Sequence, residues 1–186
     1  MERVSLDEIE SGVSETGVER HGLTEPLGTG DVAISRYRLD PGERLGSLHA
    51  HLDQEEVFVV TEGEATFETL SGEVTVEADE AIRFAPGEFQ AGTNDSIRTV
   101  TMYALGAPRE TEAIRIPLSC EVCGHDSVRP GTAEESETPV LVCPDCGAES
   151  ETACSACGND DKRVVLADDG ETPLDICPDC GLERRV

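Results

Sequence analysis

Residues 42–63 read GERLGSLHAHLDQEEVFVVTEG, and this stretch decides how the first part of the chain folds. His49 and His51 are two positions apart, so a strand places both imidazoles on one face. Glu56 follows a short turn and starts a nearly apolar strand that ends at Gly63. The stretch therefore predicts β-structure that carries two imidazoles on one face and a carboxylate shortly after them.

The surrounding sequence predicts short strands joined by tight turns. Apolar segments at 32–39, 56–60, 65–69, 74–77, 81–84 and 97–105 are separated by turn signals such as Pro41-Gly42 and Pro86-Gly87. Strands at this spacing indicate a β-sandwich or β-barrel. We expect this domain to occupy residues 31–112, after a polar N-terminal extension at 1–30. One barrel of this size buries a modest core, and a homodimer is one arrangement that would support it.

The barrel resembles the cupins, small β-barrels of the jelly-roll type that hold a metal inside. The first family motif is matched by Gly42-x6-His49-x-His51-x4-Glu56-x6-Gly63. The second motif is degenerate here. Gly87 and Asn94 stand where expected, whereas Gln90 replaces the last ligand histidine of the family. The resemblance covers about residues 30–105 and implies an all-β fold with metal ligands His49, His51 and Glu56, with Gln90 beside them.

Gln90 changes the expected chemistry, because an amide oxygen is a weaker donor than imidazole for transition metals. We expect a divalent ion (Fe, Mn, Ni or Zn) at this set, and a metal-free barrel that binds a polar ligand is the alternative. Arg36, Arg38 and Arg83 lie on expected strands. They are either candidates for binding a substrate carboxylate or ordinary surface residues.

Residues 120–180 contain all eight cysteines, in four C-x-x-C pairs. The first two pairs repeat 34 positions later, and a glycine follows every pair. Four thiolates in two such pairs build a closed tetrahedral zinc site with a structural role. The pattern resembles zinc ribbons, expected at 118–149 and 152–186. The repeat favours two sequential sets, with a crossed pairing of the middle four cysteines as the alternative. The two sets are Cys120, Cys123, Cys143, Cys146 and Cys154, Cys157, Cys177, Cys180.

The formal net charge is −26, from 40 acidic residues against 14 basic ones, and Lys162 is the single lysine. This excess of acidic residues resembles that of the cupin-domain proteins of haloarchaea. Molar salt shortens the Debye length to roughly 3 Å, so it screens the repulsion between these negative charges. An acidic protein from a low-salt organism is the alternative. Phosphate binding needs local positive charge, so nucleic acid is not the expected partner of the ribbons. We expect them to serve structure or protein–protein contact.

The chain shows no apolar run long enough for a membrane span and no secretory signal at its start, so we expect a cytoplasmic protein without membrane contact. Three classes of function remain open. The barrel is a module that binds a small polar molecule, a metal-dependent isomerase or oxygenase acting on a small acid or sugar, or part of a nucleic-acid-associated regulator. An enzyme needs a second acid or base beside the metal, and the sequence offers no convincing candidate beyond Glu55, so catalysis stays undecided.

Overall fold

The structure is a computed structural model that describes residues 1–14, 17–133, 138–159, 163–167, 169 and 172–185. Strands make up nearly all of its regular structure, which confirms the all-β fold class, a cupin-type barrel followed by two small four-cysteine modules. The helical elements are the one-turn η1 (Leu6–Glu8) and α1 (Thr24–Leu27). No helix within these ranges is long and apolar enough to cross a membrane. Lys162 lies outside the described residues.

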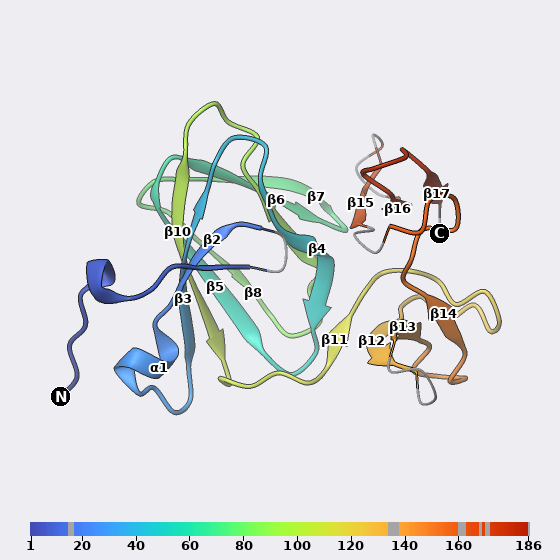
Figure 1. The fold of residues 1–186 in the computed structure, drawn as a ribbon, viewed down its shortest axis with the longest axis horizontal. Helices are drawn as coiled ribbons and strands as arrows, with labels where there is room; N and C mark the ends of the chain where they lie inside the picture. The colour runs from blue at the N-terminus through green and yellow to red at the C-terminus, as the bar shows by residue number, and fades with distance from the viewer. Residues whose placement is uncertain (15–16, 134–137, 160–162, 168, 170–171, 186) are drawn as a thin grey trace.

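Two sheets form the barrel (Figure 1). The first has the strand order β1-β2-β3-β10-β5-β8 and the second has the order β11-β4-β9-β6-β7. All pairings between neighbouring strands are antiparallel where they are described. The strands are β1 (Gly12–Val13), β2 (Glu19–Gly22), β3 (Ala33–Leu39), β4 (Arg44–His51), β5 (Glu55–Glu62), β6 (Glu64–Thr69), β7 (Gly72–Glu77), β8 (Ala81–Phe84), β9 (Gln90–Thr93), β10 (Val100–Ala107) and β11 (Ile114–Arg115).

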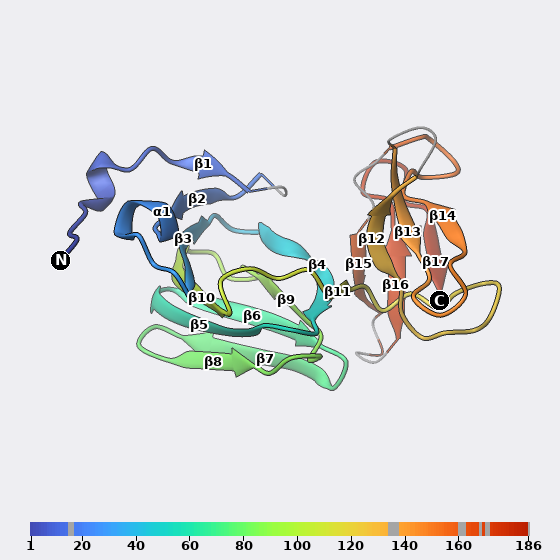
Figure 2. The ribbon, with the colours of Figure 1, turned by 90° about the horizontal axis from the view of Figure 1, so that it is seen from below.

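The N-terminal extension contributes to the barrel sheet, although its polar sequence predicts little structure. β2 pairs with β3, and β1 pairs with β2. Figure 2 shows these two strands lying along one side of the barrel. Val18, just before β2, is 1% exposed and belongs to the main apolar core. The extension is therefore anchored by burial of an apolar side chain and by strand pairing.

Aromatic side chains from both sheets meet in the core. Phe67 on β6 lies 4.9 Å from Phe58 on β5 and 5.5 Å from Phe84 on β8, measured between ring centroids. Tilted contacts at this separation are favourable for aromatic pairs. Val60 and Met102 are fully buried around them. The core thus joins the two sheets and leaves the other end of the barrel interior for polar groups.

Each cysteine-rich module is a three-stranded antiparallel sheet. The first consists of β12 (Arg129–Thr132), β13 (Pro139–Val142) and β14 (Glu149–Glu151), and the second of β15 (Arg163–Leu166), β16 (Pro173–Ile176) and β17 (Glu183–Arg185). Both lie on the side of the barrel formed by β4 (Figures 1 and 2).

A second apolar cluster joins the modules to the barrel. Leu48 on β4 and Ala91 on β9 are fully buried there against Leu118 and Val128 of the first module and Val164 of the second. The backbone N–H of Val164 also donates to Ser47 Oγ, at 3.4 Å. The modules therefore cover the outer face of β4 and β9 instead of hanging free.

Gly63, in the turn between β5 and β6, has a backbone conformation and close neighbours that favour glycine over any other residue. Its φ is +80°, and a Cβ built there lies 2.6 Å from the carbonyl oxygen of Thr99. Gly72 has φ +111° but open space around its Cβ position. Left-handed backbone alone costs a non-glycine residue about 1–2 kcal/mol.

We expect Gly63→Ala to lower the free energy of unfolding clearly more than Gly72→Ala, because only the first adds a clash with backbone. Denaturant unfolding of both variants at one salt concentration measures the difference. Equal losses would show that the turn yields and that the close approach to Thr99 is not limiting.

Candidate functional site

The candidate metal-binding group lies where β4 faces β9 and β5. His49 and His51 point to the interior side of β4, and His49 is the register partner of Gln90 on β9. Glu56 comes from the start of β5. One ligand atom each from His49, His51 and Glu56 lies within 4.8 Å of the others. The fold therefore brings together the residues that the sequence motif selects, and their use as metal ligands stays a prediction.

The short distances within this group define its shape. The Nε2 atoms of His49 and His51 are 3.2 Å apart, and their rings are nearly perpendicular at 83°. His51 Nε2 is 3.5 Å from Glu56 Oε2. Gln90 Nε2 donates a hydrogen bond of 2.9 Å to the same carboxylate oxygen. All four side chains thus converge on a small volume.

Hydrogen bonds on the far side of each ring fix both tautomers. His49 Nδ1 lies 2.7 Å from the carbonyl oxygen of Ser47, which can only accept, so Nδ1 carries the proton. His51 Nδ1 lies 3.1 Å from Thr111 Oγ1, and that hydroxyl donates to Asp53 Oδ1 at 2.7 Å. The Thr111 oxygen can therefore only accept from His51. Both Nε2 atoms are left with lone pairs, and these face each other.

Two facing lone pairs beside a carboxylate require a cation, either a proton or a metal ion. The pKa of His51 is lowered, because burial disfavours the imidazolium more than Glu56 favours it, and His49 adds to the lowering. The same hydroxyl of Thr111, followed by the backbone N–H of Glu112, lowers the pKa of Asp53, so this carboxylate stays an acceptor. Neutral imidazoles with free Nε2 atoms are the form that binds a divalent metal.

Gln90 adds a further acceptor to the group. Its side chain is 3% exposed, and its Oε1 atom is buried without a hydrogen-bond donor among the described residues. A buried carbonyl oxygen without a partner costs free energy unless water, a ligand or an ion satisfies it. The donor set therefore fits a divalent ion with two imidazole nitrogens, one carboxylate oxygen and a neighbouring amide oxygen.

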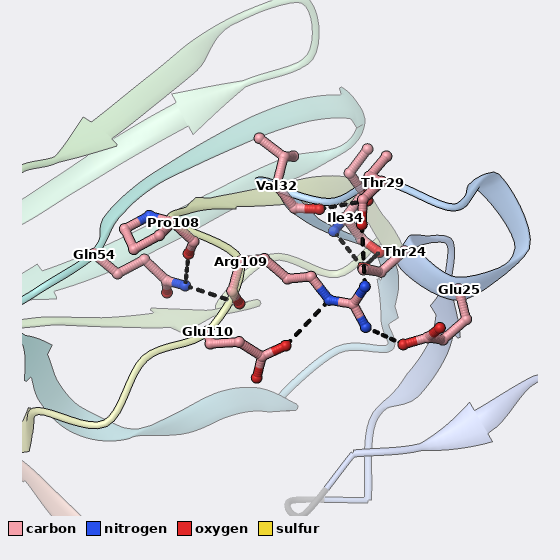
Figure 3. Close-up of polar contacts among 9 residues, drawn as sticks. All are labelled: Thr24, Glu25, Thr29, Val32, Ile34, Gln54, Pro108, Arg109 and Glu110. Carbon is pink, nitrogen blue, oxygen red and sulfur yellow. Dashed lines mark hydrogen bonds and ion pairs between the residues drawn. The ribbon is translucent and has the colours of Figure 1, made fainter.

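The segment that leaves β10 holds Thr111 in place beyond the sequence motif. Gln54, which is buried, donates from Nε2 to the carbonyl oxygen of Pro108 at 2.6 Å. Arg109 donates to the carbonyl oxygen of Thr29 at 3.1 Å and pairs with Glu25 (Figure 3). These contacts fix the residues just before Thr111, so the orientation of His51 depends on the chain after the barrel.

The cavity beside this group has a volume of about 340 Å³ and is lined by residues of both sheets. Its polar end contains His49, His51, Glu56 and Gln90, and its apolar wall includes Leu45, Phe58 and Ala104. Ser14, Arg20, Tyr37 and Gly46 complete the lining. This volume suits a small molecule.

The arginines expected from the sequence do not line this cavity. Arg38 lies 3.7 Å from Glu19 and 3.9 Å from Asp40 at the surface. Arg83 pairs at 2.8 Å with Glu55, which is the further acid that the sequence suggested. Arg36 also lies outside the lining. These residues follow the interpretation as surface arginines.

Arg20 and Tyr37 are two polar lining residues that sequence reasoning missed. They are register partners on β2 and β3 and so share one face of the sheet. The signal was the alternation of Val18 and Arg20, which places both on the same face of the strand. It is weak because the strand is four residues long and its neighbours are polar.

The cysteines form two separate groups of four in sequential order: Cys120, Cys123, Cys143, Cys146 and Cys154, Cys157, Cys177, Cys180. In each group two Sγ–Sγ distances are 3.6 Å. The structure thus groups the cysteines as the repeat predicts and not in the crossed arrangement. The ligand chemistry fits zinc, which tetrahedral thiolate sites favour.

Backbone N–H groups prepare the first cysteine of each group for metal binding. Those of Cys123 and Val122 lower the pKa of Cys120 to about 6. Those of Ala156 and Cys157 lower the pKa of Cys154 to about 6 in the same way. Gly124 and Gly158, both at φ +77°, close these turns. Turns that favour the thiolate are expected at a zinc site, because the thiolate is the ligand.

Comparison with known proteins supports this architecture. Residues 35–105 match the family model described as a cupin domain, so the cysteine-rich modules lie outside the match. A comparison with curated proteins found no match.

Several solved structures share the fold at low sequence identity. A sugar phosphate isomerase from a cupin superfamily, from Silicibacter pomeroyi, is 19% identical, with a TM-score of 0.56, 80% of this chain covered and 92% of that chain. The polyketide cyclase RemF from Streptomyces resistomycificus is 22% identical, with a TM-score of 0.55 and coverage of 65% and 88%. A predicted oxalate decarboxylase from Thermotoga maritima is 24% identical, with a TM-score of 0.50 and coverage of 57% and 98%. At these identities the likeness concerns the fold.

Thr111 offers a test of the tautomer assignment. In metal-free protein, Thr111→Val removes the acceptor of the His51 Nδ1 proton, so we expect His51 to change from one tautomer to a mixture. Ring ¹⁵N chemical shifts of His51 measure this. Thr99→Val is the matched control, since it removes a similar bond of 3.0 Å to Asp40 away from the cavity. An unchanged His51 spectrum in Thr111→Val would contradict the assignment.

Proposed function

We propose that the barrel binds a small polar molecule beside a divalent metal ion held by His49, His51 and Glu56, with Gln90 as a neighbouring weak ligand. The observation that carries this proposal is the pair of facing Nε2 lone pairs, 3.2 Å apart next to a carboxylate. Such an arrangement is favourable only with a cation between these groups. The cavity of about 340 Å³ at the same place gives room for the ligand.

The residues of the chain have distinct parts in this site. Ser47 and Thr111 hold the two rings through Nδ1, and Gln90 holds the Glu56 carboxylate through its amide N–H. When bound, the metal supplies a Lewis acid that polarises an oxygen of the ligand. The apolar wall of Leu45 and Phe58 excludes water from one side of the ligand.

Binding without catalysis is the reading that these residues favour. Glu55 does not line the cavity and pairs with Arg83 at the surface. No described lining residue other than the expected ligands is a carboxylate or an imidazole. A metal-dependent isomerase or oxygenase acting on a small acid or sugar is the second candidate. The sugar phosphate isomerase among the structural neighbours favours it, although that likeness concerns the fold.

Elemental analysis of the purified protein tests whether the barrel holds a metal ion in addition to the two zinc ions. In protein supplied with iron, manganese, nickel and zinc, we expect two zinc ions per chain and a third divalent ion. His49→Ala should lose the third ion and keep both zincs, while His21→Ala on β2 should keep all three. A wild-type content of two zincs alone would refute the barrel metal.

We also propose that the two zinc ribbons, 118–149 and 152–186, stabilise the barrel by covering β4 and β9. Support comes from the shared apolar cluster of Leu48, Ala91, Leu118, Val128 and Val164. Each ribbon is too small to bury a core alone, so zinc and this contact supply its stability. A cavity of about 490 Å³ lies between the ribbons, with Val122 and Leu182 among its lining. Protein contact through the ribbons stays a prediction, as do a high-salt source, a cytoplasmic location and a homodimer.

Val164→Ala tests the covering role with the zinc ligands intact. Removing two buried methyl groups should cost about 1.5 kcal/mol at roughly 0.8 kcal/mol each, and β4 amides should exchange hydrogen faster. Val165→Ala is the control, because this neighbour is less buried and points to the opposite face of β15. Hydrogen exchange under native conditions, measured by mass spectrometry, compares the protection of the β4 amides in the two variants. Equal protection of β4 in the two variants would contradict the covering role.

A further inference from the structure

Arg20 occupies a place that the proposed metal site does not explain. It lies on β2 directly opposite Tyr37 of β3, and both line the barrel cavity. Val18, two residues earlier, is buried in the core, and the alternation of the strand turns Arg20 to the same face, where it is exposed and lines the cavity at its solvent side. The N-terminal strand thus brings a positive charge to a cavity whose other charged group is Glu56.

The guanidinium of Arg20 is held by neutral groups. Its Nε and Nη2 atoms donate to Ser35 Oγ at 3.0 and 2.9 Å. It lies 6.0 Å from the centre of the Tyr37 ring. None of the described carboxylates is within ion-pair distance of it. Arg38, Arg44 and Arg83 of the same barrel each pair with an acid, in a chain with 40 acidic residues.

These contacts leave the Nη1 side of the guanidinium available to a ligand. Ser35 occupies Nε and Nη2, and no described residue accepts from Nη1. Ser35 is 6% exposed, so its hydroxyl holds the fork in a fixed orientation. A guanidinium with a fixed orientation binds a planar carboxylate more selectively than a lysine ammonium does.

The two ends of the cavity differ in charge, and this orients the guest. The Glu56 carboxylate lies at the end with His49 and Gln90, where it repels an anion unless a metal neutralises it. Arg20 attracts an anion at its own end. The wall between them is apolar, formed by Tyr37, Phe58 and Ala104.

We propose that the ligand of the barrel is a small organic acid whose carboxylate pairs with Arg20 and whose apolar part lies against Tyr37 and Phe58. This inference rests on the proposed function, since it names the class of ligand for the same cavity. It makes Arg20 the residue that determines specificity for an acid over its neutral analogue. A guest that fills about 340 Å³ is limited to a small molecule.

Pairs of an acid and its amide test the inference on the full-length, metal-loaded chain in molar KCl. The probes are acetate and acetamide, 3-methylbutanoate and 3-methylbutanamide, and phenylacetate and phenylacetamide, measured by calorimetry. We expect at least one acid to bind ten times more tightly than its amide. Arg20→Gln should abolish this preference, and Arg38→Gln, on the outer face of β3, should keep it. Wild-type protein without any preference, or Arg20→Gln with the preference intact, would overturn the inference.

Arg20→Lys covers the case in which the glutamine variant fails to fold. Lysine keeps the charge but not the fork, so we expect affinity for the acid to fall several-fold and affinity for the amide to stay the same. Unchanged affinity for the acid would again overturn the inference.

Metal content separates this inference from the proposed function. Arg20 does not contact the expected metal ligands, so Arg20→Gln should contain as much metal as wild type. If the chain contains no barrel metal but its binding of the acid still depends on Arg20, the proposed metal site is refuted and the role of Arg20 stands. A barrel metal with no dependence of acid binding on Arg20 would refute the inference alone.

Discussion

The two-residue alternation of β4 is the constraint on which the rest of this structure depends. Its inner positions carry His49 and His51, and its outer positions carry the fully buried Leu48 and Ala50. A shift of register by one residue would exchange these faces. The imidazoles would then lie under the ribbons and the leucine would lie in the cavity. The candidate metal group and the contact with the zinc ribbons are therefore two faces of a single strand.

Both histidines are also held from the ribbon side of the molecule. Ser47, whose carbonyl oxygen accepts from His49, receives the backbone N–H of Val164 on its hydroxyl. Thr111, which accepts from His51, belongs to the segment that continues into β11 and the first ribbon. Hydrogen-bond partners of metal ligands fix their tautomers and orientation. The geometry between the rings thus depends on chain segments outside the barrel motif.

The sequence was enough to predict the barrel, the two cysteine groups and the convergence of His49, His51 and Glu56. These features rest on short-range patterns, namely strand alternation, turn residues and fixed ligand spacing. Thr111 and Arg20 could not be found in this way. Thr111 is 60 residues from His51, and Arg20 is 15 residues from Ser35. Their roles follow from which strands become neighbours. Thr111 gives no local sign of its role, and for Arg20 the only local sign is the weak alternation with Val18. The docking of the ribbons depends likewise on tertiary packing of Leu48 and Val164.

The position of Thr111 has a consequence for how this protein can be divided. The family match ends at residue 105, which suggests a natural place to separate barrel from ribbons. A fragment cut there would lack the hydroxyl that orients His51 and the strand that pairs with it through Ile114. It would also bare Leu48 and Ala91 to water. The connecting segment therefore supports the pocket from behind its lining, and exchange of the ribbons for another module would have to keep Thr111 and the pairing of Ile114 with His51.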